Sequence, residues 1–192
     1  MYSTPSPPSR IRRYEEYGYV LGPTRRGRSH TVRGKEGHIV TVIGEEMLTL
    51  LEILGAPGSK FHNGERLYIG KNDRTKVSYV LGRIPYDRLS AGAKSSIPEV
   101  VAIIVTNNEQ RFVEYLNNAG PITPRVHALE LIPGIGKTYM NAMIDERERK
   151  KFASYEDLRE RVGLGDPIKH IVERIVSEIS GQSRRMNMFV KR

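Results

Sequence analysis

The sequence predicts an α+β protein, in which a small OB-like β-barrel is followed by an all-α domain of tandem helical hairpins. Three observations lead to this prediction. Short β-like runs separated by glycine turns fill residues 36–90, helical periodicity begins after Pro85, and the tripeptide Gly134-Ile135-Gly136 recurs as Gly163-Leu164-Gly165. With 192 residues and an apolar content of 38%, the chain is long enough for one large or two small domains.

Positive charge is concentrated at the two ends of the chain. Residues 1–35 contain eight Lys or Arg and two acids, and residues 182–192 contain four Lys or Arg and no acid, which leaves residues 36–181 close to neutral. Cationic end segments favour phosphate polymers, because each neutralised phosphate releases a condensed counterion. Solubilising tails and contacts to an acidic protein are the alternatives. The candidate contacts in the basic N-terminal segment and the basic C-terminal tail are Arg25, Arg26, Arg28, Arg184 and Arg185.

The barrel is predicted over residues 36–90, and the β-like segment 14–22 could belong to it. Between them lies a Gly/Arg loop that cannot bury an apolar face. The run EEMLTLLEIL fits either a strand or a helix, because its apolar residues also recur at helical spacing. The expected strands are HIVTVIG from His38, a run through Leu67 and Ile69 after the Asn63-Gly64 turn, and a run within residues 71–84.

A linking helix is predicted within residues 91–120, from about Pro98 to Leu116. Proline is favoured in the first turn of a helix, so Ser96 or Ile97 would precede the helix start. The sequence Asn117-Asn118-Ala119-Gly120-Pro121 would end it. Its apolar stripe consists of Val101, Ile104, Val105, Phe112 and Leu116.

The segment LIPGIGKTYM, residues 131–140, ends like a nucleotide-binding P-loop, but the glycine that a P-loop needs at its first position is Leu131 here. The preceding residues TPRVHALELI have helical spacing, with Thr123 as a plausible N-cap and Pro124 at the first helical position. We therefore expect no ATP site and no small-molecule substrate, and predict a turn between two helices. In that turn the glycines permit a tight reversal, and Ile135 packs inward.

The second helix of this hairpin would begin at Lys137. The unpaired N–H groups and positive dipole end of a helix start bind phosphate. Lys137 adds a cation and Thr138 adds a hydroxyl at the same point. The N-terminal end of this helix is therefore the strongest candidate phosphate site in the sequence.

The pattern resembles the helix-hairpin-helix module of DNA- and RNA-binding proteins, through Leu131, Pro133-Gly134-Ile135-Gly136 and Ala142. Residues 128–167 look like the tandem helix-hairpin-helix unit of bacterial competence-type DNA-uptake proteins. The resemblance implies an all-α tandem helix-hairpin-helix domain over residues 121–181. The nucleic-acid-binding residues would be Gly134, Ile135, Gly136, Lys137, Thr138, Gly163, Gly165 and Lys169.

The second turn differs from the first in its chemistry. Asp166 and Pro167 stand where the first turn has Lys137 and Thr138, and a carboxylate there competes for the N–H groups and repels phosphate. We expect the first hairpin to bind and the second mainly to support it, aided by Lys169. A hairpin that only packs, or that binds protein, stays open as an alternative.

Two further helices are expected in this domain. Ser154 can cap a helix that ends near Arg161, with Asp157 as a capping-box partner. A last helix would open with Asp166 and Pro167 and carry apolar residues on one face.

Over nearly the whole chain, the succession of GERLYIGK in a barrel, a helical linker and AGPIT leading into LIPGIGK is similar to an uncharacterised archaeal family of predicted RNA-binding proteins. This implies binding to RNA or DNA, within a ribonucleoprotein or repair assembly. RNA is favoured over DNA by the barrel and the Gly/Arg loop. Binding would be largely independent of base sequence, because the hairpin contacts backbone phosphates. The alternative is a protein-interaction or scaffold module in a ribosomal, repair or transcription assembly.

We expect no enzymatic activity, cofactor or metal. The histidines are scattered without H-x-E or H-E-x-x-H spacing, and the absence of cysteine excludes thiolate sites and disulfides. Asp157 fits a helix cap better than the catalytic aspartate of helix-hairpin-helix DNA glycosylases. No apolar run is long enough to span a membrane, and the N-terminal residues lack the apolar core of a signal peptide, so a cytoplasmic location is expected.

Two further expectations concern side chains outside the hairpins. The acidic pairs Glu15-Glu16, Glu45-Glu46 and Asp145-Glu146 are expected on solvated faces. Tyr68 is expected to pack in the barrel core.

Overall fold

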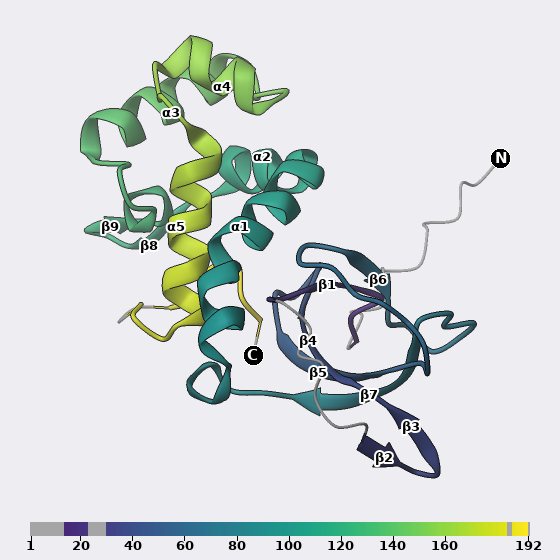
Figure 1. Ribbon diagram of the computed structural model, residues 1–192. Helices are drawn as coiled ribbons and strands as arrows, with labels where there is room; N and C mark the ends of the chain where they lie inside the picture. The colour runs from purple at the N-terminus through teal and green to yellow at the C-terminus, as the bar shows by residue number, and fades with distance from the viewer. Residues whose placement is uncertain (1–13, 23–29, 184–185, 192) are drawn as a thin grey trace, which may run out of the picture.

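The computed structural model describes residues 14–22, 30–183 and 186–191. In this part of the chain, a five-stranded antiparallel sheet curls into a half-barrel and five α-helices pack beside it (Figure 1). The predicted α+β class is confirmed.

The sheet has the strand order β6-β1-β4-β5-β7, and each pair of neighbours is antiparallel. Among the described residues, β6 and β7 are its unpaired edges, so the barrel is open along one side. Two short hairpins, β2–β3 and β8–β9, lie outside the sheet. The strands of the sheet are β1 Tyr17–Val20, β4 Ile39–Gly44, β5 Leu50–Gly55, β6 Arg66–Tyr68 and β7 Val77–Arg83. The outlying strands are β2 His30–Val32, β3 Lys35–Gly37, β8 Pro121–Thr123 and β9 Val126–His127.

The sheet is apolar on both faces and contributes to two separate cores. Alternate residues of a strand point to opposite faces, so Val42 and Ile53 fill the barrel interior while Ile43 and Leu50 face the helices. The ambiguous run EEMLTLLEIL is thus a turn followed by strand β5. The second core continues without a break from the outer face of the sheet to the last helix.

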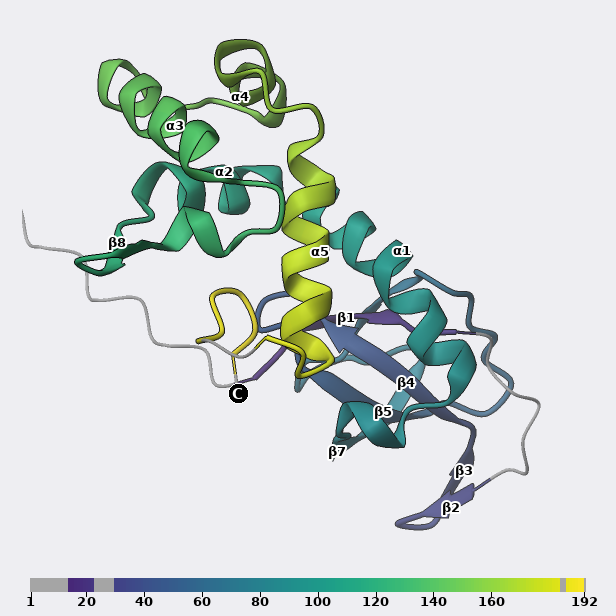
Figure 2. The ribbon, with the colours of Figure 1, turned by 90° about the vertical axis from the view of Figure 1, so that its left-hand side faces the viewer.

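The helices are α1 Ala91–Asn107, α2 Glu109–Asn118, α3 Lys137–Arg149, α4 Tyr155–Val162 and α5 Pro167–Ile179. Two short 3₁₀ helices, η1 Tyr86–Arg88 and η2 Ala128–Leu131, precede α1 and α3. Helix α1 lies between the sheet and α5, while α3 and α4 lie at the end of the molecule away from the sheet (Figures 1 and 2). The segment predicted as a link is therefore the centre of the shared core.

The predicted start of the linking helix at Pro98 is wrong. Helix α1 begins seven residues earlier, because the Ser90 hydroxyl accepts a hydrogen bond from the N–H of Ala93 at 3.1 Å and caps the helix there. Pro98 lies inside α1 on an exposed position. The single predicted helix is also divided into α1 and α2 at Asn108.

The predicted first helix of the first hairpin is largely absent. Thr123 belongs to the β8–β9 hairpin rather than to a helix cap, and only the four residues of η2 are helical. His127 caps η2, since its Nδ1 accepts from the N–H of Leu129 while the Glu130 carboxylate accepts from the N–H of His127. The helices α3, α4 and α5 match their predictions, including the Ser154 cap and the Asp166-Pro167 start.

The C-terminal residues pack against the body of the protein. Phe189 is buried against Phe112 and Tyr115. The carboxylate of Glu178 accepts hydrogen bonds from the N–H groups of residues 188, 189 and 190 at 2.8–3.0 Å. The described part of the predicted basic tail is therefore held by the last helix.

Two of the acidic residues expected on solvated faces differ from this expectation, since Glu15 is buried and Glu45 is half-buried. The Glu15 carboxylate accepts from the N–H groups of Glu46 and Met47 and from the Thr49 hydroxyl. Glu45 forms a bidentate pair with Arg66, whose hydrogen bond lowers the pKa of Glu45.

Tyr68 is half-buried rather than in the core. Its ring packs edge-on against that of Tyr17, with the ring centroids 5.4 Å apart. Strand alternation explains the position, because the neighbouring Leu67 fills the barrel interior and directs Tyr68 to the other face.

No helix in the described ranges is long and apolar enough to cross a membrane. The same residues contain no group of three or more His, Asp or Glu side chains that could hold a metal ion.

Candidate nucleic-acid interface

The first turn, Pro133 to Gly136, reverses the chain between η2 and α3. Ile135 is buried, whereas the residues on both sides of it are exposed. Gly134 has a φ of +82°, and a Cβ added there would lie 2.3 Å from Cε1 of His170. Glycine is thus required by both the backbone and the close contact with α5.

The N-terminal end of α3 is open to solvent. Its N-cap is Gly136, which offers no side-chain acceptor, and the first turn contains no acidic residue. Lys137, Thr138 and Tyr139 are all exposed. Lys137 forms no ion pair with any described residue. Backbone donors, a cation and a hydroxyl therefore coincide where the helix dipole is positive.

The second turn repeats the left-handed glycine and the buried aliphatic residue of the first, but its helix begins one residue later in the pattern, with Asp166 as the N-cap of α5. Gly163 ends α4 in the left-handed region with a φ of +75°, and Leu164 is buried as Ile135 is. The Asp166 carboxylate accepts from the N–H of Lys169 at 3.1 Å, and Pro167 has no N–H to offer. A carboxylate therefore already occupies the position that a phosphate would take.

The two turns are neighbours in space. His170, which contacts Gly134, lies in the first turn and a half of α5, and its N–H donates to the carbonyl of Asp166. Lys169 is exposed beside it. The structure thus brings together the predicted residues of the first turn, the second turn and Lys169.

Arginine side chains hold α3 in place from its C-terminal half. Arg147 donates to the carbonyl of Leu116 at 2.7 Å, which joins α3 to α2. Arg161 donates to the carbonyls of Glu146 and Lys150 and pairs with the Glu146 carboxylate, which joins α4 to α3. The N–H of Ala153 donates to the Asp157 carboxylate in the first turn of α4, and this hydrogen bond lowers the pKa of Asp157. These arginines are structural, and their contacts lie at the end of α3 opposite to Lys137.

A second cationic surface lies at the other end of the molecule. The β2–β3 hairpin extends from the half-barrel away from α3 and α4 (Figures 1 and 2). Arg33 and Lys35 lie over the Tyr79 ring at 5.7 and 5.5 Å from its centroid. The predicted contacts Arg25, Arg26, Arg28, Arg184 and Arg185 lie outside the described residues.

Sequence reasoning missed the buried pair of Arg174 and Glu178 that fastens the C-terminal segment. The Arg174 Nε donates to the Glu178 carboxylate at 2.8 Å, and its other nitrogens donate to the carbonyls of Leu131 and Met186. Arg174 thereby also supports the chain leading into the first turn. The available signal was an Arg and a Glu four residues apart on the apolar face of a predicted helix.

Comparison with known proteins gives a family match over most of the chain. Residues 14–191 match the model of the family described as "Protein of unknown function (DUF655)". An uncharacterised protein of Methanocaldococcus jannaschii is 39% identical over 180 residues, which cover 93% of this chain and 81% of that protein. The crystal structure of Af1531 from Archaeoglobus fulgidus, of the same family, superposes with a TM-score of 0.79 at 35% identity, covering 92% of this chain and all of that one.

Proposed function

The chain belongs to the DUF655 family of uncharacterised archaeal proteins, and we propose that it binds nucleic acid without enzymatic activity and largely independently of base sequence. The observation that carries this proposal is the open N-terminal end of α3, where Lys137 and Thr138 stand beside uncapped N–H groups. These groups suit a backbone phosphate and offer nothing that would distinguish one base from another.

The proposal includes a tandem helix-hairpin-helix arrangement with unequal halves. The recurrence of an αL glycine next to a buried aliphatic residue, at Gly134-Ile135 and at Gly163-Leu164, supports it. The Asp166 carboxylate already accepts from the N–H of Lys169 at the start of α5, which favours a structural role for the second hairpin. In the first hairpin, the short η2 takes the place of a full helix.

RNA is proposed as the preferred polymer, within a ribonucleoprotein or repair assembly in the cytoplasm. The curled sheet of short strands supports an OB-like interpretation of the half-barrel, and the cationic β2–β3 hairpin adds a second phosphate-binding surface. The other candidate is a protein-interaction module. The buried aliphatic residues of the two turns, Ile135 and Leu164, would stabilise the turns equally well for that function.

A binding titration separates these two functions. We expect single- and double-stranded RNA and DNA all to bind, with affinity falling steeply between about 50 and 200 mM salt because phosphate contacts release counterions. Unrelated sequences of one length should bind within about threefold of each other. Binding that is absent at low salt for all four polymers would reject the proposal and favour a protein partner.

Asp166→Asn tests the unequal roles of the hairpins. The amide keeps the helix cap, so thermal stability should be nearly unchanged, while loss of the carboxylate should raise oligonucleotide affinity about two- to threefold. Asp145→Asn, at an exposed position on α3, makes the same change of charge and is the control. Equal gains from both variants would show a general charge effect and no role for the second turn.

A further inference from the structure

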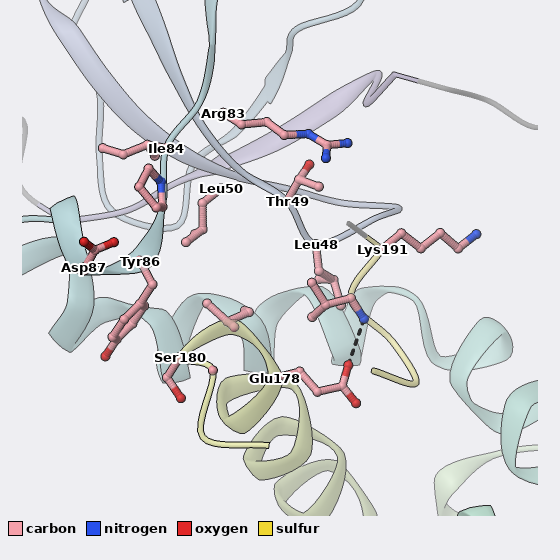
Figure 3. Close-up of a pocket in the computed structure, with 14 residues that line it drawn as sticks. Leu48, Thr49, Leu50, Arg83, Ile84, Tyr86, Asp87, Glu178, Ser180 and Lys191 are labelled. Carbon is pink, nitrogen blue, oxygen red and sulfur yellow. Dashed lines mark hydrogen bonds between the residues drawn. The ribbon is translucent and has the colours of Figure 1, made fainter. Parts of the chain in front are cut away.

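Two cavities meet at the open edge of the half-barrel. The first, of about 440 Å³, lies at the mouth of the barrel, with walls from the chain after β6, from the edge strand β7 and from residues 47–51 at the start of β5. The second, of about 620 Å³, lies between the sheet and the C-terminal end of α5 (Figure 3). Thr49 and Arg83 line both, so the two cavities flank one arginine.

The floor of each cavity is apolar and its rim is cationic. Leu51, Ile69 and Val80 line the barrel-mouth cavity, and Leu48, Leu50 and Ile179 line the other. The cations on the rims are Lys71, Arg74, Arg83 and Lys191. Volumes of about 300–1,000 Å³ are typical of sites for small organic groups.

No described ion pair joins the acids in these walls to the cations of the rims. Glu15 and Glu178 are buried, and backbone N–H groups already donate to both carboxylates. Among the described residues, Asp87 is the one remaining acid in the walls of the two cavities, and it lies at the far end from Arg83 and Lys191 (Figure 3). Arg83 is exposed, and no described carboxylate pairs with it.

An aromatic ring completes the barrel-mouth cavity. Tyr14 is 67% exposed and lies with the Lys71 ammonium 4.9 Å from its ring centroid. An exposed aromatic ring can stack on a nucleotide base while a neighbouring cation contacts the phosphate of the same nucleotide. Apolar floors, a stacking ring and a line of cations together match an unstacked nucleotide strand better than a duplex, in which the bases cannot enter a cavity.

Resting on the proposed nucleic-acid binding, we propose that these two cavities hold successive unstacked nucleotides of a single strand, with the phosphate between them on Arg83. The surface, called here the edge groove, is distinct from the turn at α3. It confers a preference for single-stranded segments, whereas the hairpin turn contacts any phosphate backbone.

The test compares Arg83→Glu with Arg88→Glu. Arg88 is an exposed arginine on η1 that lines neither cavity, so both variants change the net charge equally. Each is titrated with a single-stranded 12-mer of RNA, the same 12-mer of DNA, the RNA duplex and adenosine monophosphate. We expect Arg83→Glu to weaken single-strand binding about tenfold and duplex binding less than about twofold, with Arg88→Glu within about twofold for both. The RNA and DNA arms show whether the groove distinguishes the two sugars.

Other outcomes overturn the edge groove. If Arg83→Glu and Arg88→Glu lowered affinity equally, or if Arg83→Glu lowered single-strand and duplex affinity equally, the effect would be due to net charge alone. Adenosine monophosphate binding as tightly as the 12-mer would make the groove a site for free nucleotides.

The two proposals can fail separately. Weaker single-strand binding by Arg83→Glu, together with unchanged duplex binding by Lys137→Glu, would keep the groove and reject the hairpin.

Discussion

Glu178→Gln is expected to lower the free energy of unfolding by about 3 kcal/mol, because removing one partner of a buried charge pair leaves the other uncompensated. Glu178 is 1% exposed and accepts from the Arg174 guanidinium and from three backbone N–H groups. Glutamine has nearly the same shape but only one acceptor oxygen, so its NH₂ group would face backbone donors. The Arg174 charge would then be buried without a counter-charge.

Urea unfolding measures this effect. Glu173→Gln is the matched control, since Glu173 lies on the same helix in an exposed position and loses the same charge. It should change stability by less than about 0.5 kcal/mol. A loss below about 1 kcal/mol for Glu178→Gln would mean that the C-terminal segment is held by apolar contacts such as those of Phe189 rather than by this carboxylate.

Lys137→Glu is expected to reduce oligonucleotide affinity about tenfold while leaving the fold intact. The change removes an exposed cation and puts a carboxylate at the first position of α3, where it repels phosphate and competes for the free N–H groups. The same carboxylate interacts favourably with the helix dipole, so thermal stability should stay equal or rise slightly. Lower affinity with equal or higher stability is a result that misfolding cannot produce.

Lys151→Glu is the control for this variant. Lys151 is also exposed, but it follows the C-terminal end of α3, about 20 Å from Lys137 along the helix axis. Lys151→Glu should lower oligonucleotide affinity less than Lys137→Glu does. Lys137→Glu should also lower the slope of log affinity against log salt by about one, as expected for one phosphate contact. Unchanged affinity in a folded Lys137→Glu variant would remove the turn from the mechanism.

The parts of the fold that the sequence predicted correctly depend on neighbouring residues. The caps at Ser154 and Asp166 and the turn glycines act within a few positions, so α4, α5 and the start of α3 could be located from spacing alone. Most strands of the sheet followed from glycine turns and apolar runs in the same way, whereas the run that forms β5 fitted a helix equally well.

The errors have both local and long-range causes. The stretch before the first turn has helical spacing, yet Thr123 and Val126 pair with each other in a hairpin and leave only η2 helical. Glu15 is buried because backbone groups about thirty residues away donate to it. The hairpin is formed by residues close in sequence, where helical spacing was misleading, whereas the burial of Glu15 has no local signal. The edge groove was also beyond prediction, because Tyr14, Lys71 and Arg83 come from separate parts of the chain.

The core that α1 shares with both the sheet and α5 has a consequence for avidity. With the half-barrel and the hairpin turns packed on one set of side chains, the edge groove and the N-terminal end of α3 are held in a fixed relation. A strand bound at one surface would meet the other at an effective concentration set by rigid geometry rather than by a flexible linker. Affinity should then rise abruptly at the oligonucleotide length that is just sufficient to span both surfaces.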